Sequence, residues 1–200
     1  MNSTISISKG NLKIGRVKSF SLPCGKSCPG ASVWCKQHCY GKKAERQYNA
    51  TRAAYLRNMY NTNNLNAWLK NMLVLVPEHT DLFRLHVAGD LFSAPYIRAW
   101  AKLVKARPNT KFWGYTRSWA HSRYNKALDV LRSMDNMTLF ASVDESMGVL
   151  PDTSWRVAYV NGTPGQTGVP CPQQKGKVAN CRACGICFNG AECSVIFDKH

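Results

Sequence analysis

The feature that most constrains this chain is one short segment, residues 24–40, with the sequence CGKSCPGASVWCKQHCY. It carries four cysteines within sixteen residues, and Pro29, Gly30 and Ser32 between them favour turns over a regular helix or strand. Thiols that are close together in a turn-rich loop can converge on a metal ion or an iron–sulfur cluster. The segment is therefore predicted to be a metal- or cluster-binding loop. Its cysteines are Cys24, Cys28, Cys35 and Cys39.

A second group of cysteines follows near the C-terminal end, with the spacing C-x9-C-x2-C-x2-C-x5-C. All nine cysteines of the chain belong to one of these two groups, and an odd number cannot pair completely as disulfides. In a reducing compartment, C-x2-C spacing more often indicates a metal or cluster site, or redox chemistry. Four of these thiols can hold either Zn²⁺ or a [4Fe–4S] cluster, and the sequence leaves both open. The four are Cys171, Cys181, Cys184 and Cys187, with Cys193 as a spare or alternative ligand.

The N-terminal residues lack the basic start and apolar core of a secretory leader, and no apolar run reaches the length of a membrane span. We therefore expect a cytosolic protein with no membrane partner. Two hundred residues with 44% hydrophobic content can form one domain with a real core. We expect a single domain over residues 1–200, in which residues 1–165 form an α/β body and residues 166–200 a cysteine-rich cluster-binding segment.

Positive charge is concentrated toward the N-terminal end. The net charge is +16, and residues 1–77 contain twelve Lys or Arg and one acidic residue, Glu45. Clustered cations attract phosphates and release their counterions, which indicates DNA or RNA as a partner. The alternative is a solvated basic face without a partner. The predicted contacts are Lys36, Lys42, Lys43, Arg46, Arg52 and Arg57.

The apolar pattern beyond residue 80 alternates between strands and helices. Strands separated by helices of this length are typical of a parallel sheet built from βαβ crossovers. About five strands are too few to close an eight-stranded barrel. We therefore expect an α/β fold with an open or partial (βα) barrel of parallel strands, and a site at the carboxyl ends of those strands. The predicted strands lie within residues 3–20 and at 82–88, 111–116, 137–143 and 156–160, the last of the sheet; the predicted helices are 44–60, 65–76, 94–106 and 122–134.

Three polar residues follow directly after three of these strands. They are Asp90, Arg117 and Asp144, in the segments HVAGDLF, GYTRSW and ASVDES. Each alone could be a helix cap, a surface residue or a turn residue. Together they are predicted to meet at one rim of the sheet. His86, within the predicted strand that precedes Asp90, is a candidate for contact with a substrate, although a structural histidine is the commoner case.

Several motifs carry a resemblance to a known family. They are SLPCGKSCPGASVWCKQHCY, FRLHVAGDLFSAPYIRAW, KFWGYTRSW and the late CPQQ followed by C-x2-C-x2-CF. Over about residues 18–190 the chain resembles the phage and mobile-element family called gene product 88, which itself looks similar to radical S-adenosylmethionine proteins. Those enzymes use a partial (βα) barrel and a three-cysteine loop after the first strand. The resemblance implies a [4Fe–4S] cluster with one open iron for S-adenosylmethionine, in the cytoplasm of an infected bacterial host.

The resemblance also assigns roles to individual residues. It centres on CPGA, WC and CY, so it implies Cys28, Cys35 and Cys39 as cluster ligands and leaves Cys24 as a spare thiol or a fourth ligand. The usual enzyme loop is C-x3-C-x2-C, whereas these three give C-x6-C-x3-C. The segment VAGD stands where the enzymes bind the amino group of the cofactor. Asp90 is therefore an expected cofactor-binding residue by this resemblance. Arg117 and Asp144 are expected to join it because they also follow strands, and the late cysteines resemble an auxiliary cluster site.

Two functions follow as hypotheses. One is a phage-type iron–sulfur protein with a radical-SAM-like fold, which could be an enzyme acting on or near nucleic acid. The other is a non-enzymatic nucleic-acid-binding protein whose Fe–S or Zn sites are structural or redox-sensing. The resemblance and the strand-end residues favour the first, and the net charge of +16 favours the second.

Overall fold

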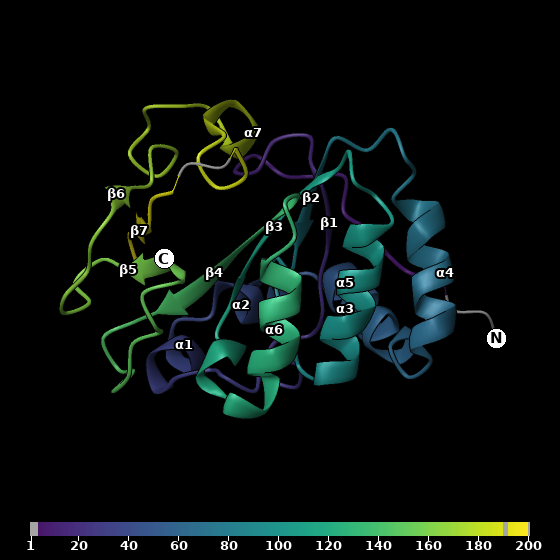
Figure 1. Cartoon of the computed structure of the whole chain (residues 1–200), viewed down its shortest axis with the longest axis horizontal. Helices are drawn as coiled ribbons and strands as arrows, with labels where there is room; N and C mark the ends of the chain where they lie inside the picture. The colour runs from purple at the N-terminus through teal and green to yellow at the C-terminus, as the bar shows by residue number, and fades with distance from the viewer. Residues whose placement is uncertain (1–3, 190–191, 200) are drawn as a thin grey trace.

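A computed structural model of the chain describes residues 4–189 and 192–199. It contains a seven-stranded, all-parallel, open sheet with the strand order β1-β2-β3-β4-β5-β7-β6, and helices on its flank (Figure 1). The strands are β1 (Lys18–Phe20), β2 (Leu82–Leu85), β3 (Lys111–Thr116), β4 (Met137–Val143), β5 (Arg156–Val160), β6 (Val169–Pro170) and β7 (Val195–Phe197). The helices are α1 (Val33–Gln37), α2 (Tyr40–Gln47), α3 (Asn49–Asn61), α4 (Leu65–Leu75), α5 (Ala94–Lys105), α6 (Asn125–Arg132) and α7 (Cys181–Cys184).

The predicted α/β class with parallel strands is confirmed, but the sheet is larger than expected. Five strands were expected, with residues 156–160 as the last, whereas β6 and β7 extend the sheet beyond β5. Both are only two or three residues long, too short to give a period-2 pattern. Pro170 lacks an amide donor and suits the edge position of β6. The cysteine-rich segment thus also contributes two strands, β6 and β7, to the sheet.

Two predicted helices also differ from the structure. The helix expected over residues 44–60 is divided into α2 and α3, because the backbone of Tyr48 is extended, with φ −124° and ψ 102°. The helix expected over residues 122–134 begins as a 3-10 turn, Ser122–Tyr124, and becomes α6 only at Asn125. No helix in the described part of the chain has both the length and the apolar character that a membrane span requires.

One face of the sheet is covered by α4, α5 and α6 (Figure 1). The core beneath them is aromatic: Trp68 of α4 and Trp100 of α5 are fully buried, with ring centroids 5.0 Å apart. Phe83 of β2 and Phe112 of β3 point to the same face, with ring centroids 5.9 Å apart. Burial of each such ring stabilises the fold by about 1.5–3 kcal/mol, so this face holds the sheet rigid.

The other face of the sheet carries the intervening side chains, because successive residues of a strand point to opposite faces. Arg84, Tyr115 and Ser142 line a cavity there. The loop with α1 lies at the carboxyl ends of β3 and β4, and the segment with α7 lies at the other end of the sheet (Figure 1). This second face positions the candidate site.

Candidate functional site

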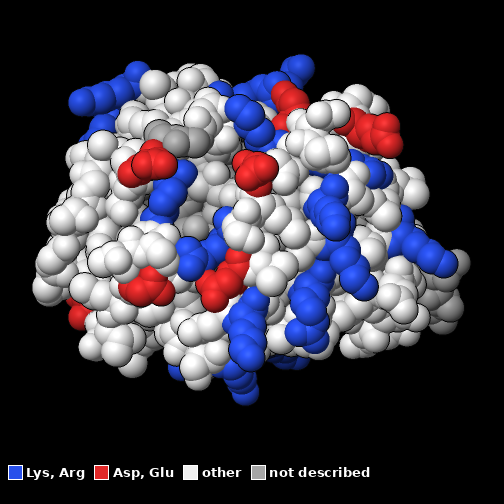
Figure 2. All heavy atoms as spheres, in the orientation of Figure 1, with Lys and Arg blue, Asp and Glu red and all other residues white. Residues whose placement is uncertain are grey.

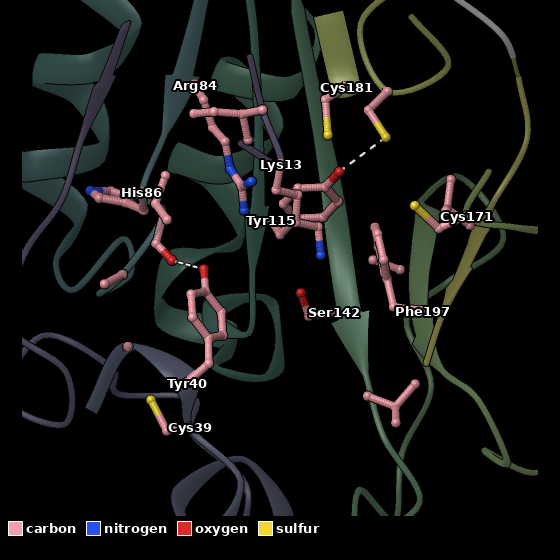
Figure 3. A pocket seen from close by; sticks show the side chains of 18 of the residues that line it. Lys13, Cys39, Tyr40, Arg84, His86, Tyr115, Ser142, Cys171, Cys181 and Phe197 are labelled. Carbon is pink, nitrogen blue, oxygen red and sulfur yellow. Dashed lines mark hydrogen bonds between the residues drawn. The ribbon is translucent and has the colours of Figure 1, made fainter. Parts of the chain in front are cut away.

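A single pocket of about 650 Å³ extends along the second face of the sheet. Eight of the nine cysteines line it, four from the segment 24–39 and four from the segment 171–187. Figure 3 labels Cys39 of the first group and Cys171 and Cys181 of the second. Cys193 is half-buried and is not among the lining residues. The volume is in the range of small-molecule and cofactor sites. The fold thus brings two distant groups of thiols to one cavity.

The first cysteine group is held against the carboxyl ends of β3 and β4. Gly30 lies so close to the backbone of Arg117 that a Cβ atom would overlap the Arg117 carbonyl group. Ser32 Oγ donates to Asp144 Oδ2 at 2.6 Å and accepts from the Cys35 amide at 3.0 Å, which caps α1. A serine at this position therefore both starts the helix and fixes the loop to β4.

Two further glycines let neighbouring segments close around this loop. A Cβ at Gly41, in the first turn of α2, would lie 2.5 Å from Cys24 Sγ and 3.0 Å from Ala88 Cβ. Gly89 has a φ of +80°, and a Cβ there would lie 2.6 Å from Leu22 Cβ. The glycine of the VAGD segment is therefore explained by a left-handed turn and a close approach between the segments that follow β1 and β2.

The thiols of the first group differ in acidity. The pKa of Cys39 is lowered, chiefly because the Cys24 thiol donates a hydrogen bond to its sulfur, and the pKa of Cys24 is raised by the same interaction and by burial. Burial raises the pKa of Cys28 to about 12 and, despite the nearby Arg117, also raises that of Cys35. Cys39 is the most readily ionised thiol of this group.

The second cysteine group lies in the crossover between β6 and β7. Asn180 caps α7, and the amide of Cys181 donates to the Lys13 carbonyl at 2.8 Å, so the N-terminal turn packs directly on this group. Arg182 forms an ion pair with Asp81 before β2. These contacts place α7 with Cys181 beside the amino ends of β1 and β2, opposite the first group, whereas Cys171 directly follows β6.

Aromatic side chains of β3 contact the second cysteine group. Tyr115 Oη donates to Cys187 Sγ at 3.0 Å (Figure 3). Burial raises the pKa of Cys187 to about 11, although the Tyr115 hydrogen bond opposes the shift. The rings of Trp113 and Phe188 lie 4.9 Å apart and anchor the segment on β3.

Two cations occupy the middle of the pocket between the cysteine groups. Arg84 comes from β2 and Lys13 from the N-terminal turn (Figure 3). Burial and the neighbouring Arg84 lower the pKa of Lys13. Neither residue was predicted as part of the site from the sequence, although an arginine within the apolar run LFRLHV was an available signal.

The three strand-end residues meet, as the sequence predicted. Asp90 Oδ2 accepts from the Arg117 amide at 2.8 Å, and Arg117 Nη1 donates to Asp144 Oδ2 at 2.5 Å. Asp90 Oδ1 also accepts from Thr116 Oγ1 at 2.6 Å, and its burial raises its pKa. The polar atoms thus bond mainly to one another and tie strand ends together. Their role in cofactor binding stays a prediction.

His86 belongs to the helix-covered core. Its Nε2 lies 2.9 Å from Tyr96 Oη, and its ring packs against Phe20 and Trp100. Burial lowers its pKa to about 3, so it is neutral at physiological pH. The structural interpretation of this histidine therefore fits better than a substrate contact.

The six cations predicted to contact nucleic acid are exposed and lie on three helices. Because α2 ends before Tyr48, Arg52 and Arg57 stand on a different helix, α3. A further exposed row, Arg98, Lys102 and Lys105, follows α5. Figure 2 shows several Lys and Arg side chains on the face of the molecule that carries this helix. Positive charge is therefore also present on α5, one of the helices that cover the first face of the sheet. Lys36 lies on α1, and Lys42, Lys43 and Arg46 lie on α2.

The donor atoms of the pocket fit a soft metal or an iron–sulfur cluster, since thiolates select Zn, Cu(I) and Fe–S centres. The thiols are not, however, already arranged as a metal-binding site. Within residues 4–189 and 192–199, no three or more His, Cys, Asp or Glu side chains already stand as a group that could hold a metal ion. Metal binding would have to draw the thiols of each loop together, as it commonly does in small cysteine sites.

Fold and site together define a parallel α/β protein with one thiol-lined pocket. The family described as Gene product 88 matches residues 3–190, and the chain belongs to that family. It is 30% identical to the Gene 88 protein of Mycobacterium phage L5, over 90% of this chain and 87% of the relative. It is likewise 30% identical to the Gene 88 protein of Mycobacterium phage D29, over 94% and 89%. No solved structure matches the chain. The predicted family is confirmed, whereas no match supports the radical S-adenosylmethionine likeness.

Proposed function

We propose that the protein is a phage-type iron–sulfur protein whose two cysteine groups face one ligand pocket. The observation that carries the proposal is the convergence of eight cysteines from two distant segments on a single cavity. Unligated cysteines are usually scattered through a core as small hydrophobes. Here the thiols line a cavity and belong to loops rich in glycine and proline, which is typical of metal ligands.

The first group would hold a [4Fe–4S] cluster through Cys28, Cys35 and Cys39. Cys24 lies beside Cys39 and would serve as a fourth ligand or as a hydrogen-bond donor to it. The second group would hold another cluster or Zn²⁺ through the four late thiols. A bound [4Fe–4S] cluster supplies one-electron chemistry and, where one iron lacks a thiolate, a coordination position for a ligand.

We extend the proposal to a radical-SAM-like enzyme that binds S-adenosylmethionine and acts on or near nucleic acid. Support comes from the position of the first cysteine loop, which follows β1 and lies at the carboxyl ends of a parallel sheet, where α/β proteins place ligands. Arg117 reaches the pocket and would orient an anionic group there. Asp144 holds the Arg117 side chain by an ion pair, so it acts as a positioning residue.

Anaerobic purification followed by iron, sulfide and zinc counting tests the proposal. We expect bound metal in the parent. Cys35→Ala is expected to lose the metal of the first cysteine group, and Cys181→Ala that of the second. Cys193→Ala is the matched control and is expected to keep the full metal content, because this residue does not line the pocket. Iron retained in Cys24→Ala would indicate three ligands and an open iron. A parent protein without iron, sulfide or zinc after anaerobic purification would refute the proposal.

A second function, nucleic-acid binding without catalysis, rests on a different observation. The six cations of α1, α2 and α3 are exposed, and Glu45 is the one acidic residue in that part of the sequence. Cations that are not neutralised by neighbouring carboxylates are free to contact phosphates. In this proposal the cysteine sites are structural or redox-sensing.

Titration of labelled DNA and RNA at several salt concentrations checks this function. Four to six phosphate contacts are expected to lose roughly two orders of magnitude in affinity between low and physiological salt. The variant Lys42→Glu, Lys43→Glu, Arg46→Glu is expected to abolish binding at physiological salt. The control variant Arg98→Glu, Lys102→Glu, Lys105→Glu reverses the same amount of charge on α5 and is expected to bind like the parent. Equal losses in both triple variants, or loss in the α5 variant alone, would contradict an N-terminal binding surface.

A further inference from the structure

The pocket holds two cations that no carboxylate neutralises. Arg84 Nε is buried and has no hydrogen-bond partner among the described residues. Across the same residues, the ion pairs involve neither Arg84 nor Lys13. Both side chains point into the space between the two cysteine groups (Figure 3). Metal binding by the cysteines does not by itself explain why two cations without carboxylate partners lie in this pocket.

Aromatic rings support the two cations without neutralising them. Arg84 Cζ lies 5.2 Å from the centre of the Tyr115 ring, and Lys13 Nζ lies 5.5 Å from the centre of the Phe197 ring. Cation–π contacts of this kind contribute less than the removal of an unpaired charge from water costs. The rings therefore do not take the place of a carboxylate partner for either cation.

The acidic residues that line the pocket are engaged elsewhere. Asp90 accepts hydrogen bonds from Thr116 and the Arg117 amide. Asp198 forms an ion pair with Lys175 at 2.8 Å. Arg117, the third cation of the pocket, is already paired with Asp144. Arg84 and Lys13 thus give the cavity two unmatched positive charges.

We infer that Arg84 and Lys13 bind the carboxylate or phosphate group of a small ligand whose apolar part lies against Tyr115 and Phe197. The planar guanidinium group can donate two parallel hydrogen bonds to either anion. A cavity of about 650 Å³ accommodates a ligand of drug-like size around that anchor. The inference does not depend on which metal the cysteines hold.

The thiolates of the second cysteine group are the competing counter-charge. The contacts favour an external anion, because Tyr115, and not Arg84, donates the hydrogen bond to Cys187 Sγ. A guanidinium group that served the thiolates would be expected to donate to a sulfur. Arg84 Nε has no hydrogen-bond partner among the described residues, a sulfur atom included.

Thermal unfolding of the protein as purified, with inorganic phosphate or acetate as the probe and chloride of equal ionic strength as the reference, tests the inference. At a probe concentration about ten times its Kd, we expect a rise in Tm of about 3–6 °C. The response should disappear in Arg84→Met and weaken in Lys13→Met. The control Arg98→Met, an exposed cation on α5, should respond like the parent. A larger response to phosphate indicates a phosphate ester as the ligand, and a larger response to acetate indicates a carboxylate.

Without a probe anion, Arg84→Met is expected to be at least as stable as the parent, since it removes an unpaired charge from the pocket. The variant should therefore fold, and its metal content should equal that of the parent. A parent that responds to phosphate and acetate no more than to chloride would overturn the inference. So would an unchanged response in Arg84→Met. Loss of bound metal from Arg84→Met would also overturn it, because it would show that the Arg84 guanidinium group stabilises the metal-bound thiolates and not an external anion.

Discussion

Replacing Asp144 by Asn is expected to lower the free energy of unfolding by about 3–5 kcal/mol, the range for breaking a buried ion pair. The Asp144 side chain is fully buried and that of Arg117 is 12% exposed, so the substitution leaves a largely buried guanidinium group without its charged partner. Asp144 also accepts from Ser32 of the first cysteine loop and from Ser146. Urea unfolding of the parent and the variant measures the loss.

A matched control is Asp129→Asn, which breaks the exposed ion pair between Asp129 and Arg132. Exposed pairs of this kind contribute about 0.2–1 kcal/mol. A loss in Asp144→Asn no larger than that of the control would contradict a buried anchoring role for Asp144.

Asp144 also makes stability depend on pH. Burial alone would raise its pKa, but hydrogen bonds from Ser32 and Ser146 and the charge of Arg117 outweigh burial, so the pKa lies below the ordinary 3.8. A carboxylate with a lowered folded-state pKa stabilises the protein above its unfolded pKa, and that contribution is lost as the pH falls through the folded pKa. The difference in stability between the parent and Asp144→Asn should therefore be full at neutral pH and shrink below about pH 4.

The parts of the fold that the sequence predicted well are those in which an apolar run is bounded by turn residues. β3 and β4 coincide with the predicted ranges because KFWGYT and MTLFASV are continuous strand-forming runs. β7 has three residues and β6 has two, so their pairing depends on neighbours that are distant in sequence. The break at Tyr48 carries no glycine or proline, and helical periodicity continues through it. Tertiary packing decides such features.

The candidate site was predictable in its residue types and less so in its arrangement. Clustered cysteines indicated two thiol sites, but the spacing could not show that both groups face one cavity from opposite ends. The convergence of Asp90, Arg117 and Asp144 followed from the rule that parallel strands end at one edge. The same rule could not show that the carboxylate oxygens of Asp90 and Asp144 accept hydrogen bonds from neighbours within the protein. The place of Lys13 in the pocket could not be predicted, because it depends on how the turn around Lys13 packs against Cys181.

Replacing Gly30 by Ala is expected to detach the first cysteine loop from the sheet and to destabilise the protein by about 3 kcal/mol, near the upper end for overpacked sites. The added Cβ would overlap the carbonyl group of Arg117 and lie 3.0 Å from the Ser118 amide nitrogen. Both obstacles are backbone atoms, which cannot rotate away as a side chain can. The loop would have to retreat as a unit.

Retreat of the loop would break the contacts that hold it. Ser32 Oγ would lose Asp144 at 2.6 Å, and the Pro29 carbonyl would lose His121 Nε2 at 2.8 Å. The half-buried Cys28 thiol should then react faster with a thiol reagent in metal-free protein. Gly148→Ala is the control, since nothing lies within 4 Å of a Cβ at that position. Because Gly148 is also a loop glycine, a difference between the two variants reports the contact at Arg117 and not the loss of a glycine. Equal stability and equal thiol reactivity in both variants would mean that the cysteine loop does not depend on this contact for its position.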